Sequence, residues 1–120
     1  LAAAFSEHAR VPIERRLEPG PPLSEEHELV VYRVAQEALT NVARHANASK
    51  VELRLERVDE RIILTVRDDG RGLPSRALRS SHGILGMRER AMLIGAQFTI
   101  TTPRGGGTEV RLSLPLGRRR

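Results

Sequence analysis

Apolar residues recur with two different periods along this chain, and the periods predict its helices and strands. From Ser24 to about Ala46 they recur every three or four residues, which predicts one long helix that stops near Asn47. The same spacing over Ile84–Ile94 predicts a second helix, and Gly95 follows it as a C-cap. Ser24 is a favourable N-cap for the first helix, with acidic residues in the turns that follow.

Alternating apolar and polar residues predict strands over most of the remaining chain. The predicted strands are 11–18, 50–57, 61–67, 97–102 and 109–114. Asp59-Glu60 is a tight turn, so the second and third strands form a hairpin. The alanine-rich stretch Leu1–Ala9 predicts a further helix, and Leu73–Ser81 has no period and predicts a mobile loop.

This order of elements indicates an α+β fold. Strands that follow one another in pairs, with helices between the pairs, predict a two-layer α/β sandwich and exclude a doubly wound sheet. We expect a mixed, mostly antiparallel sheet covered on one face by about three helices. Residues 1–120 form one domain in this interpretation, with 1–10 as the end of a connecting helix and 115–120 as a basic tail.

Composition removes several classes of function. The chain has no cysteine, so disulfide frameworks and thiolate metal sites are excluded. The net charge of +5 comes from arginines spread along the chain, with Lys50 the only lysine and Arg118–Arg120 the only dense run. Three aromatic residues offer no stacking platform, which argues against direct nucleic-acid binding. No stretch approaches the roughly 20 apolar residues of a spanning helix, so we expect a cytoplasmic domain, attached to a membrane only through other parts of a longer chain.

The run Asp68-Asp69-Gly70-Arg71-Gly72 directly follows a strongly apolar strand. A carboxylate accepts hydrogen bonds, so Asp68 in a buried position would select the exocyclic amine of adenine and reject the carbonyl of guanine. Gly70 and Gly72 let the backbone lie against a flat base. Aliphatic residues at 62, 64, 73 and 85 are expected to form the walls. The alternative is an ordinary acidic turn at the end of a hairpin.

The long helix carries polar residues on one face. Arg33, Glu37, Asn41 and either Arg44 or His45 are three or four residues apart. A solvated helix face is the plain interpretation. Asparagine is unfavourable within a helix unless its amide has a partner, and Mg²⁺ accepts a few protein oxygens together with waters and phosphates. Asn41, with Glu37 nearby, therefore predicts a magnesium site.

Two glycine-rich segments complete the candidate site. Gly83-Ile84-Leu85-Gly86-Met87 begins the second helix, where backbone N–H groups can face phosphates, although no P-loop pattern is present. Gly105-Gly106-Gly107-Thr108 is either a flexible turn or the start of a strand beside Asp68, with the Thr108 hydroxyl supporting that carboxylate.

The order of these motifs resembles the ATP-binding domain of sensor histidine kinases, in the superfamily of gyrase, Hsp90, MutL and histidine kinases (the Bergerat fold). Residues 37–45 resemble its N box, residues 68–72 and 83–87 its two glycine boxes, and residues 106–108 its glycine-threonine motif. The stretch 82–90 is similar to the nitrate-sensor subfamily, whose partner response regulators carry helix-turn-helix output domains.

The resemblance implies a role for each matching residue. Asn41 would coordinate Mg²⁺, Asp68 would read the adenine amine, and Glu37 would be the catalytic general base or a positioning group. Residues 73–82 would form a short lid over ATP. The remaining expected ATP-binding residues are Arg44, His45, Gly70, Gly72, His82, Gly83, Leu85, Gly86, Met87 and Thr108.

The resemblance also implies that one part is missing. Neither His8 nor His27 lies in the sequence context of the family's phosphoacceptor histidine. The expected function is a protein-histidine kinase catalytic domain that passes the γ-phosphoryl of ATP to a histidine on a helical dimerisation domain outside this chain. The alternatives are an anti-sigma-factor-type serine kinase and a nucleotide-binding regulator without kinase activity.

Overall fold

The computed structural model describes five segments of the chain. They are residues 13–17, 24–42, 50–70, 82–103 and 106–115. The elements in chain order are β1 (Ile13–Leu17), α2 (Glu25–Asn41), β2 (Val51–Val58), β3 (Arg61–Asp68), α4 (His82–Leu93), β4 (Gln97–Thr101) and β5 (Thr108–Pro115). No helix among these segments is long and apolar enough to cross a membrane.

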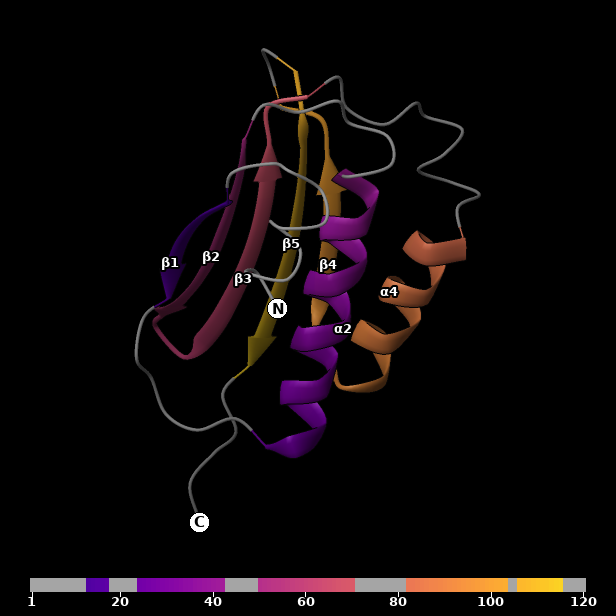
Figure 1. Cartoon of the computed structure of the whole chain (residues 1–120). Helices are drawn as coiled ribbons and strands as arrows, with labels where there is room; N and C mark the ends of the chain where they lie inside the picture. The colour runs from indigo at the N-terminus through magenta and orange to yellow at the C-terminus, as the bar shows by residue number, and fades with distance from the viewer. Residues whose placement is uncertain (1–12, 18–23, 43–49, 71–81, 104–105, 116–120) are drawn as a thin grey trace.

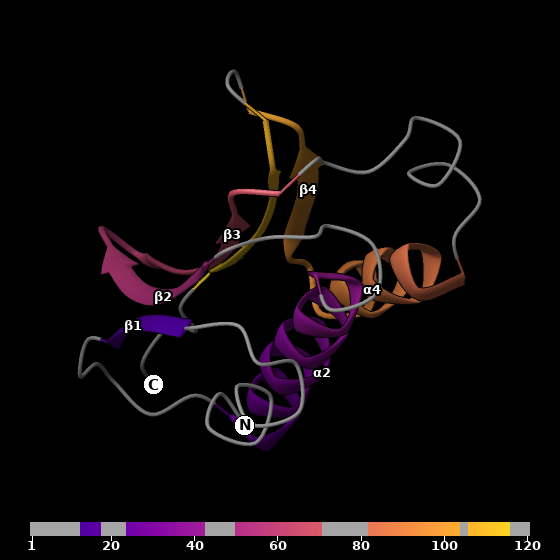
Figure 2. The same cartoon turned by 45° about the horizontal axis from the view of Figure 1, so that its top comes forward.

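The molecule has two layers, a twisted sheet and a pair of helices (Figure 1). The strand order is β1-β2-β3-β5-β4, with β1 parallel to β2 and every other neighbouring pair antiparallel. Both α2 and α4 cover the same face of the sheet, which the rotated view also shows (Figure 2). The predicted α+β sandwich with a mixed, mostly antiparallel sheet is confirmed. The third helix expected at residues 1–9 lies outside the described residues, as does the basic tail expected at 115–120 except for Pro115, which ends β5.

The core lies between the helices and the sheet. Side chains alternate across a strand, so Ile62, Leu64 and Val66 of β3 all face α2 and α4. From the helices, Val34 and Leu39 of α2 are essentially inaccessible to solvent. The predicted apolar positions of the long helix are thus confirmed as core, because they repeat on the face that meets the sheet.

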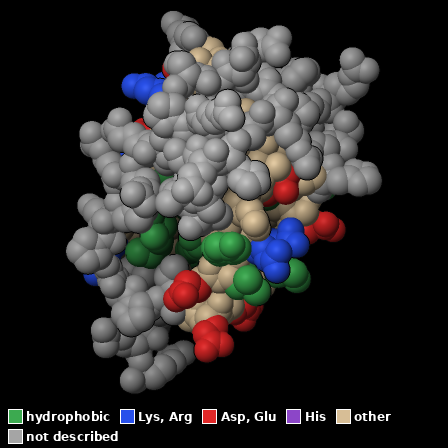
Figure 3. Space-filling model, viewed as in Figure 1, with side chains coloured by type: hydrophobic (Ala, Val, Ile, Leu, Met, Phe, Trp, Pro, Cys, Tyr) green, Lys and Arg blue, Asp and Glu red, His purple; other side chains and the backbone are tan. Residues whose placement is uncertain are grey.

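Helix α2 begins as its sequence predicts. Ser24 has extended backbone, and its hydroxyl accepts a hydrogen bond of 3.1 Å from the His27 N–H. Acidic side chains of the first turn gather at the lower end of the helix layer in Figure 3, where the helix dipole favours them. The described part of α2 ends at Asn41, and the predicted extension to Ala46 lies outside the described residues.

Helix α4 starts two residues before the predicted Ile84, at His82, and ends at Leu93, one residue before the predicted Ile94, with Gly95 following as the predicted cap. Gly95 has a φ of +69°, and its N–H donates to the Met92 carbonyl. The Ala96 N–H donates to the Ala91 carbonyl at 2.9 Å, which completes a Schellman cap. This cap turns the chain directly into β4.

The hairpin and the late strands also match their predictions within a few residues. The β2–β3 turn contains Asp59 at a φ of +56°, a conformation that aspartate tolerates. Strand β3 continues one residue beyond the prediction, to Asp68, and β5 begins one residue earlier, at Thr108. Asp68 and Thr108 are directly paired in the ladder. These two extensions place the candidate site inside the sheet and not in the turns beside it.

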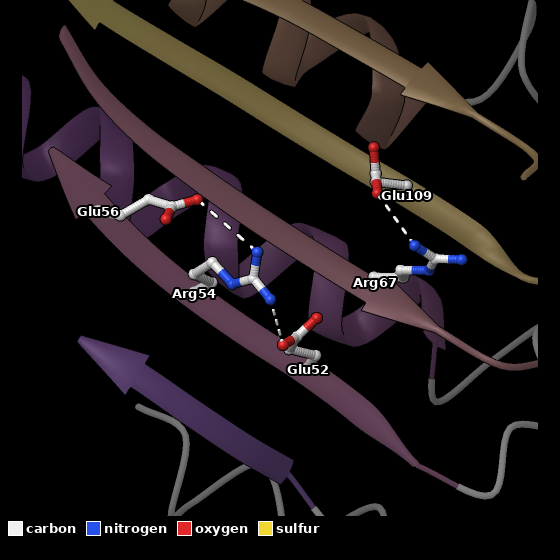
Figure 4. Close-up of polar contacts among 5 residues, drawn as sticks. All are labelled: Glu52, Arg54, Glu56, Arg67 and Glu109. Atoms are coloured by element: carbon white, nitrogen blue, oxygen red, sulfur yellow. Dashed lines mark hydrogen bonds and ion pairs between the residues drawn. The ribbon is translucent and has the colours of Figure 1, made fainter. Parts of the chain in front are cut away.

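The sheet face opposite the helices carries charged side chains in complementary pairs (Figure 4). Arg54 lies between two acids of its own strand, 2.7 Å from Glu52 and 3.8 Å from Glu56. Arg67 of β3 lies 3.8 Å from Glu109 of β5, its ladder partner. Exposed pairs of this kind contribute little stability each. They keep this face polar, so the apolar face and its pocket are fixed on the helix side.

The Schellman cap gives a first prediction. Gly95→Ala should destabilise the domain by about 1 kcal/mol, because only glycine adopts a positive φ without steric cost. Urea unfolding followed by circular dichroism measures this difference. Gly86→Ala is the matched control, since an added Cβ there would meet only the flexible Arg90 Nη1 at 3.3 Å. An equal loss of stability in both variants would contradict the role assigned to Gly95.

Candidate nucleotide-binding site

Asp68 ends strand β3 and points its carboxylate toward the helix layer. Only 4% of the residue is exposed. The carboxylate accepts a hydrogen bond of 2.8 Å from the Gly70 N–H, and another from the backbone N–H of Thr108. These two donors hold the acid in place from both neighbouring strand ends. Asp68 is therefore a buried, hydrogen-bonded residue at the end of a strand and not an exposed turn residue.

The pKa of Asp68 is raised above its ordinary value of 3.8, chiefly because burial disfavours the charged carboxylate. The hydrogen bonds from Gly70 and Thr108 act in the opposite direction, and the nearby charge of Asp69 adds a small further increase. Burial therefore outweighs the two donors. A carboxylate with so little water around it gains from a hydrogen-bond donor supplied by a ligand.

A small pocket opens beside Asp68, between α2 and the sheet. Its empty space is about 280 Å³ when the part open to solvent is counted, but the cavity volume itself is about 10 Å³, roughly the room for one water molecule. Apart from three polar side chains the lining is aliphatic: Ala38, Asn41, Val42, Val66, Asp68, Ile100, Thr108 and Val110. Such a lining, apolar with few polar groups, is typical of a site for a flat organic ring.

The predicted pocket walls were wrong in detail. Ile62 and Leu64 share a face of β3 with Asp68, but they lie deeper along the strand and belong to the core. Leu85 is 44% exposed and does not line the pocket, and Leu73 lies outside the described residues. Val66 of β3 and apolar residues of α2, β4 and β5 form the walls instead. Of these wall residues, Ala38 and Val42 could have been predicted from the sequence, because they lie on the same helix face as Asn41.

Two buried polar groups in this pocket have no hydrogen-bond partner among the described residues. They are Asn41 Nδ2 and Thr108 Oγ1. Native proteins seldom leave buried polar atoms unpaired, so such atoms mark places where a ligand or water completes the bonding. The expectation that the Thr108 hydroxyl supports Asp68 was wrong, because the backbone N–H of Thr108 fills that role and leaves the hydroxyl free.

The exposure of the side chains on the polar face of α2 decreases along the helix. Arg33 is exposed, Glu37 is half-buried and Asn41 is buried. Asn41 lines the pocket, whereas the Glu37 carboxylate lies against Gly83 at the start of α4, where an added Cβ would be only 2.6 Å from Glu37 Cδ. The structure thus separates the two residues: one faces the sheet and the other faces the second helix.

The remaining predicted site residues lie in different surroundings. Gly86 is half-buried in the first turns of α4, beside Arg90. The Met87 side chain is 1% exposed and packs in the core on the same helix face as Ile84 and Ala91, and it does not line the pocket; its expected contact with ATP stays a prediction. His82 is the first residue of α4. The others, Arg44, His45 and Gly72, lie outside the described residues.

The glycine-rich turn before β5 is required by close backbone contact. Gly107 has a φ of +88°, and a Cβ there would overlap the Asp68 carbonyl. Gly106 also has a positive φ and lies beside the Gly70 carbonyl. Of the two alternatives for this segment, the strand start beside Asp68 is confirmed. Sequence reasoning missed the close contact itself, although the run of three glycines was its signal.

Comparison with known proteins places this geometry in a family. Residues 26–118 match the family of histidine kinase-, DNA gyrase B- and Hsp90-like ATPases. The chain belongs to this ATPase family. The matched range includes nearly all of α2, both residues of the Asp68–Thr108 pair and the whole of α4.

Relatives of this ATPase-family domain are sensor proteins. It is 44% identical over 93 residues to the signal transduction histidine-protein kinase/phosphatase UhpB of Salmonella typhimurium, matching 78% of this chain and 18% of UhpB. It is 37% identical over 89 residues to the sensor protein VraS of Staphylococcus aureus, matching 73% of this chain and 26% of VraS. The chain therefore spans about a quarter or less of these relatives.

Solved structures agree with the fold of the ATPase-family domain. A histidine kinase domain from the Erythrobacter litoralis blue-light-activated kinase EL346 superposes with a TM-score of 0.83 at 25% identity. The match covers 96% of this chain and 57% of that chain. The resemblance inferred from the sequence motifs is confirmed, and membership of an ATPase family implies ATP as the nucleotide.

The raised pKa of Asp68 predicts a specific dependence of stability on pH. Because the folded state raises this pKa, the ionised carboxylate destabilises the fold at neutral pH, and the cost disappears as the pH falls through the raised pKa toward 3.8. Asp68→Asn removes the charge, so we expect its stability gain over the wild type to shrink across that window. Urea unfolding at several pH values measures this difference.

Asp59→Asn, in the exposed turn, is the matched control for removing one acidic residue. A stability difference for Asp68→Asn that grows as the pH falls would contradict the assigned cause of the shift.

Proposed function

We propose that this chain is the ATP-binding catalytic domain of a two-component sensor histidine kinase. In this function it delivers the γ-phosphoryl of ATP to a histidine on a helical dimerisation domain elsewhere in the parent protein. The observation that carries the proposal is the buried Asp68 carboxylate beside an apolar pocket with two unpaired polar groups. The names of the relatives UhpB and VraS, a histidine kinase and a sensor, support it.

Asp68 would read the base in this function. The backbone donors from Gly70 and Thr108 occupy part of its acceptor capacity, and the side chain lines the pocket, where its remaining capacity would serve a ligand. The exocyclic amine of adenine is a donor, whereas guanine presents a carbonyl at the same place. Two acceptors facing each other in a dry pocket repel, so the same geometry disfavours GTP. The aliphatic walls, including Val66 and Ile100, would hold the two faces of the ring.

Asn41 would hold Mg²⁺ through its amide oxygen. The amide fits this role, because Asn41 lines the pocket and its oxygen is the kind of ligand that Mg²⁺ accepts, while its Nδ2 group, unpaired among the described residues, would be free to donate to a phosphate oxygen. Mg²⁺ takes few protein ligands and completes its octahedron with waters and phosphate oxygens. When bound, the ion neutralises charge on the phosphates during transfer. Glu37 lies one turn away on α2, where it would act as general base or as a positioning group.

The first turn of α4 would face the phosphates. Gly83 lies in this turn and Gly86 directly after it, and the positive end of the helix dipole points toward residues preceding the helix. Arg44 and His45 would contact the phosphates, as implied by the N-box resemblance. Chemistry in such a site comes from positioning and charge neutralisation and not from a covalent intermediate.

The partners would lie outside this chain. The parent kinase would supply the phosphoacceptor histidine, and a response regulator with a helix-turn-helix output domain would take the phosphoryl group onward. The domain would work in the cytoplasm and would reach a membrane only through other parts of the parent.

Phosphoryl transfer tests this function directly. The chain is mixed with a purified helical dimerisation domain that carries a phosphoacceptor histidine, together with radiolabelled ATP and Mg²⁺. We expect phosphate that is labile in acid and stable in base, because phosphohistidine has this behaviour. Acid-stable label on an added protein substrate would indicate a serine kinase, and ATP binding without any transfer would indicate a regulator; either result would contradict the histidine kinase.

Nucleotide selection tests the role of Asp68. Calorimetric titration should show binding of MgATP and little binding of MgGTP. Asp68→Asn should lose about 1.5–3 kcal/mol of ATP binding, as expected for a hydrogen bond to a charged group. Asn41→Ala is the matched control from the same pocket: it should weaken the dependence on Mg²⁺ and keep the preference for ATP over GTP. Equal affinity of the wild type for both nucleotides would rule out base reading by Asp68.

A further inference from the structure

Asp69 directly follows the last residue of β3, and its carboxylate binds the backbone of the neighbouring strand. Asp69 Oδ1 accepts a hydrogen bond of 3.0 Å from the backbone N–H of Lys50. Lys50 directly precedes β2, and the β2–β3 ladder ends at the pair Val51–Asp68. The bond therefore joins the next two residues beyond the ladder, and a side-chain oxygen takes the place of a backbone carbonyl.

The course of the backbone after Asp68 explains this replacement. The Gly70 N–H turns back and donates to Asp68 Oδ1 at 2.8 Å, which is an Asx turn. A backbone that turns in this way leaves the sheet and no longer continues the ladder with β2. Asp69 lies within the turn, and its side chain supplies the acceptor for the Lys50 N–H instead.

The two adjacent acids attach this strand end to both neighbouring strands. The Asp68 carboxylate accepts from the Thr108 N–H at the start of β5, whereas the Asp69 carboxylate accepts from Lys50 before β2. Asp68 is buried toward the helix layer, and Asp69 is exposed. The peptide between Asp69 and Gly70, whose N–H donates to Asp68, lies directly beside these two attachments.

Little packing restrains the strand end on the side of Asp69. Lys50, Asp69 and Asp68 line an open hollow with a cavity volume of about 340 Å³. Among the described residues, Asp68 alone lines both this hollow and the candidate nucleotide pocket. The end of β3 thus separates two spaces. Because empty space lies beside it, hydrogen bonds and not side-chain packing limit its movement toward the hollow.

We propose that Asp69 is a positioning residue for base selection: its hydrogen bond to the Lys50 N–H holds the turn that presents the Gly70 N–H to Asp68. The link to base selection rests on the proposed function, in which Asp68 reads the adenine amine. A hydrogen bond weakens steeply when its angle or length changes. A looser turn would therefore weaken the contact with the amine and leave the phosphate contacts unchanged.

The charge of Asp69 has a separate effect, which suitable variants distinguish from its hydrogen bond. This charge contributes to the raised pKa of Asp68, because two neighbouring carboxylates repel each other. Asp69→Asn removes the charge but keeps an oxygen that can accept from Lys50, whereas Asp69→Ala removes both. If the charge alone mattered, the two variants would behave alike; if the hydrogen bond matters, they differ.

The test compares MgATP with the magnesium complex of purine riboside triphosphate, which lacks the exocyclic amine, by calorimetric titration. The ratio of the two affinities isolates the amine contact, because a general loss of structure weakens both ligands equally. We expect Asp69→Ala to lower this ratio about fivefold, as for the partial loss of a hydrogen bond to a charged group. Asp69→Asn should keep the wild-type ratio.

Glu52→Ala is the matched control. It removes another acid that lines the same hollow, and the Glu52 side chain pairs with Arg54 and not with the turn after β3. The ratio of the two affinities should therefore equal that of the wild type.

Amide hydrogen exchange followed by NMR tests the contact without any nucleotide. In Asp69→Ala the amide of Lys50 loses its acceptor, and the amide of Gly70 is held less firmly against Asp68. Both should exchange about fivefold faster than in the wild type, the effect of roughly one hydrogen bond. In Asp69→Asn both amides should keep their protection.

The outcomes distinguish this proposal from the function on which it rests. An unchanged ratio in Asp69→Ala, or equal losses in Asp69→Ala and Asp69→Asn, would overturn the positioning role. Unchanged exchange at Gly70 would overturn the turn as its cause. A wild-type chain that binds both triphosphates equally would instead refute base reading by Asp68, while the exchange of Lys50 and Gly70 would still decide whether Asp69 holds the turn.

Discussion

The buried carboxylate of Asp68 is the constraint on which the rest of the site depends. A charged group with 4% exposure is costly to desolvate, and the backbone N–H groups of Gly70 and Thr108 offset part of that cost. To provide them, the chain must turn sharply after β3 and β5 must begin opposite Asp68. Gly107 is needed for the same reason, because its backbone passes against the Asp68 carbonyl. One acid thus determines the shape of both strand ends.

The helix layer is organised around the same place. Helix α2 presents apolar residues to the sheet along most of its length, and then Asn41, a buried amide, where it passes Asp68. Helix α4 begins against Glu37, one turn earlier on α2. Base, metal and phosphate groups would therefore be read by three neighbouring elements, with α2 as their common support. The rigid core behind them, centred on Leu39 and Val34, keeps these spacings fixed.

The features that could be predicted from the sequence are those that depend on local patterns. Helix and strand periods, the Ser24 cap and the Gly95 cap depend on neighbouring residues, and they appear as predicted. Asp68 and Asn41 stood out because each residue type is unusual at its position in a strand or a helix. The pocket walls, the contact of Gly107 and the core position of Met87 could not be read in this way. They depend on the register between β3 and β5 and on helix packing, which join residues far apart in the chain.

The pairing of Asp68 with Thr108 also sets the order in which the protein can become functional. The first strand end of the site is synthesised well before the last strand, β5, which supplies a backbone donor, the Thr108 hydroxyl and the Val110 wall. Contacts between distant segments form slowly during folding. A nascent chain whose β5 is still inside the ribosome would thus have an incomplete pocket, in which Asp68 lacks the backbone donor from Thr108. Nucleotide capture is therefore a property of the finished domain and of no earlier folding stage.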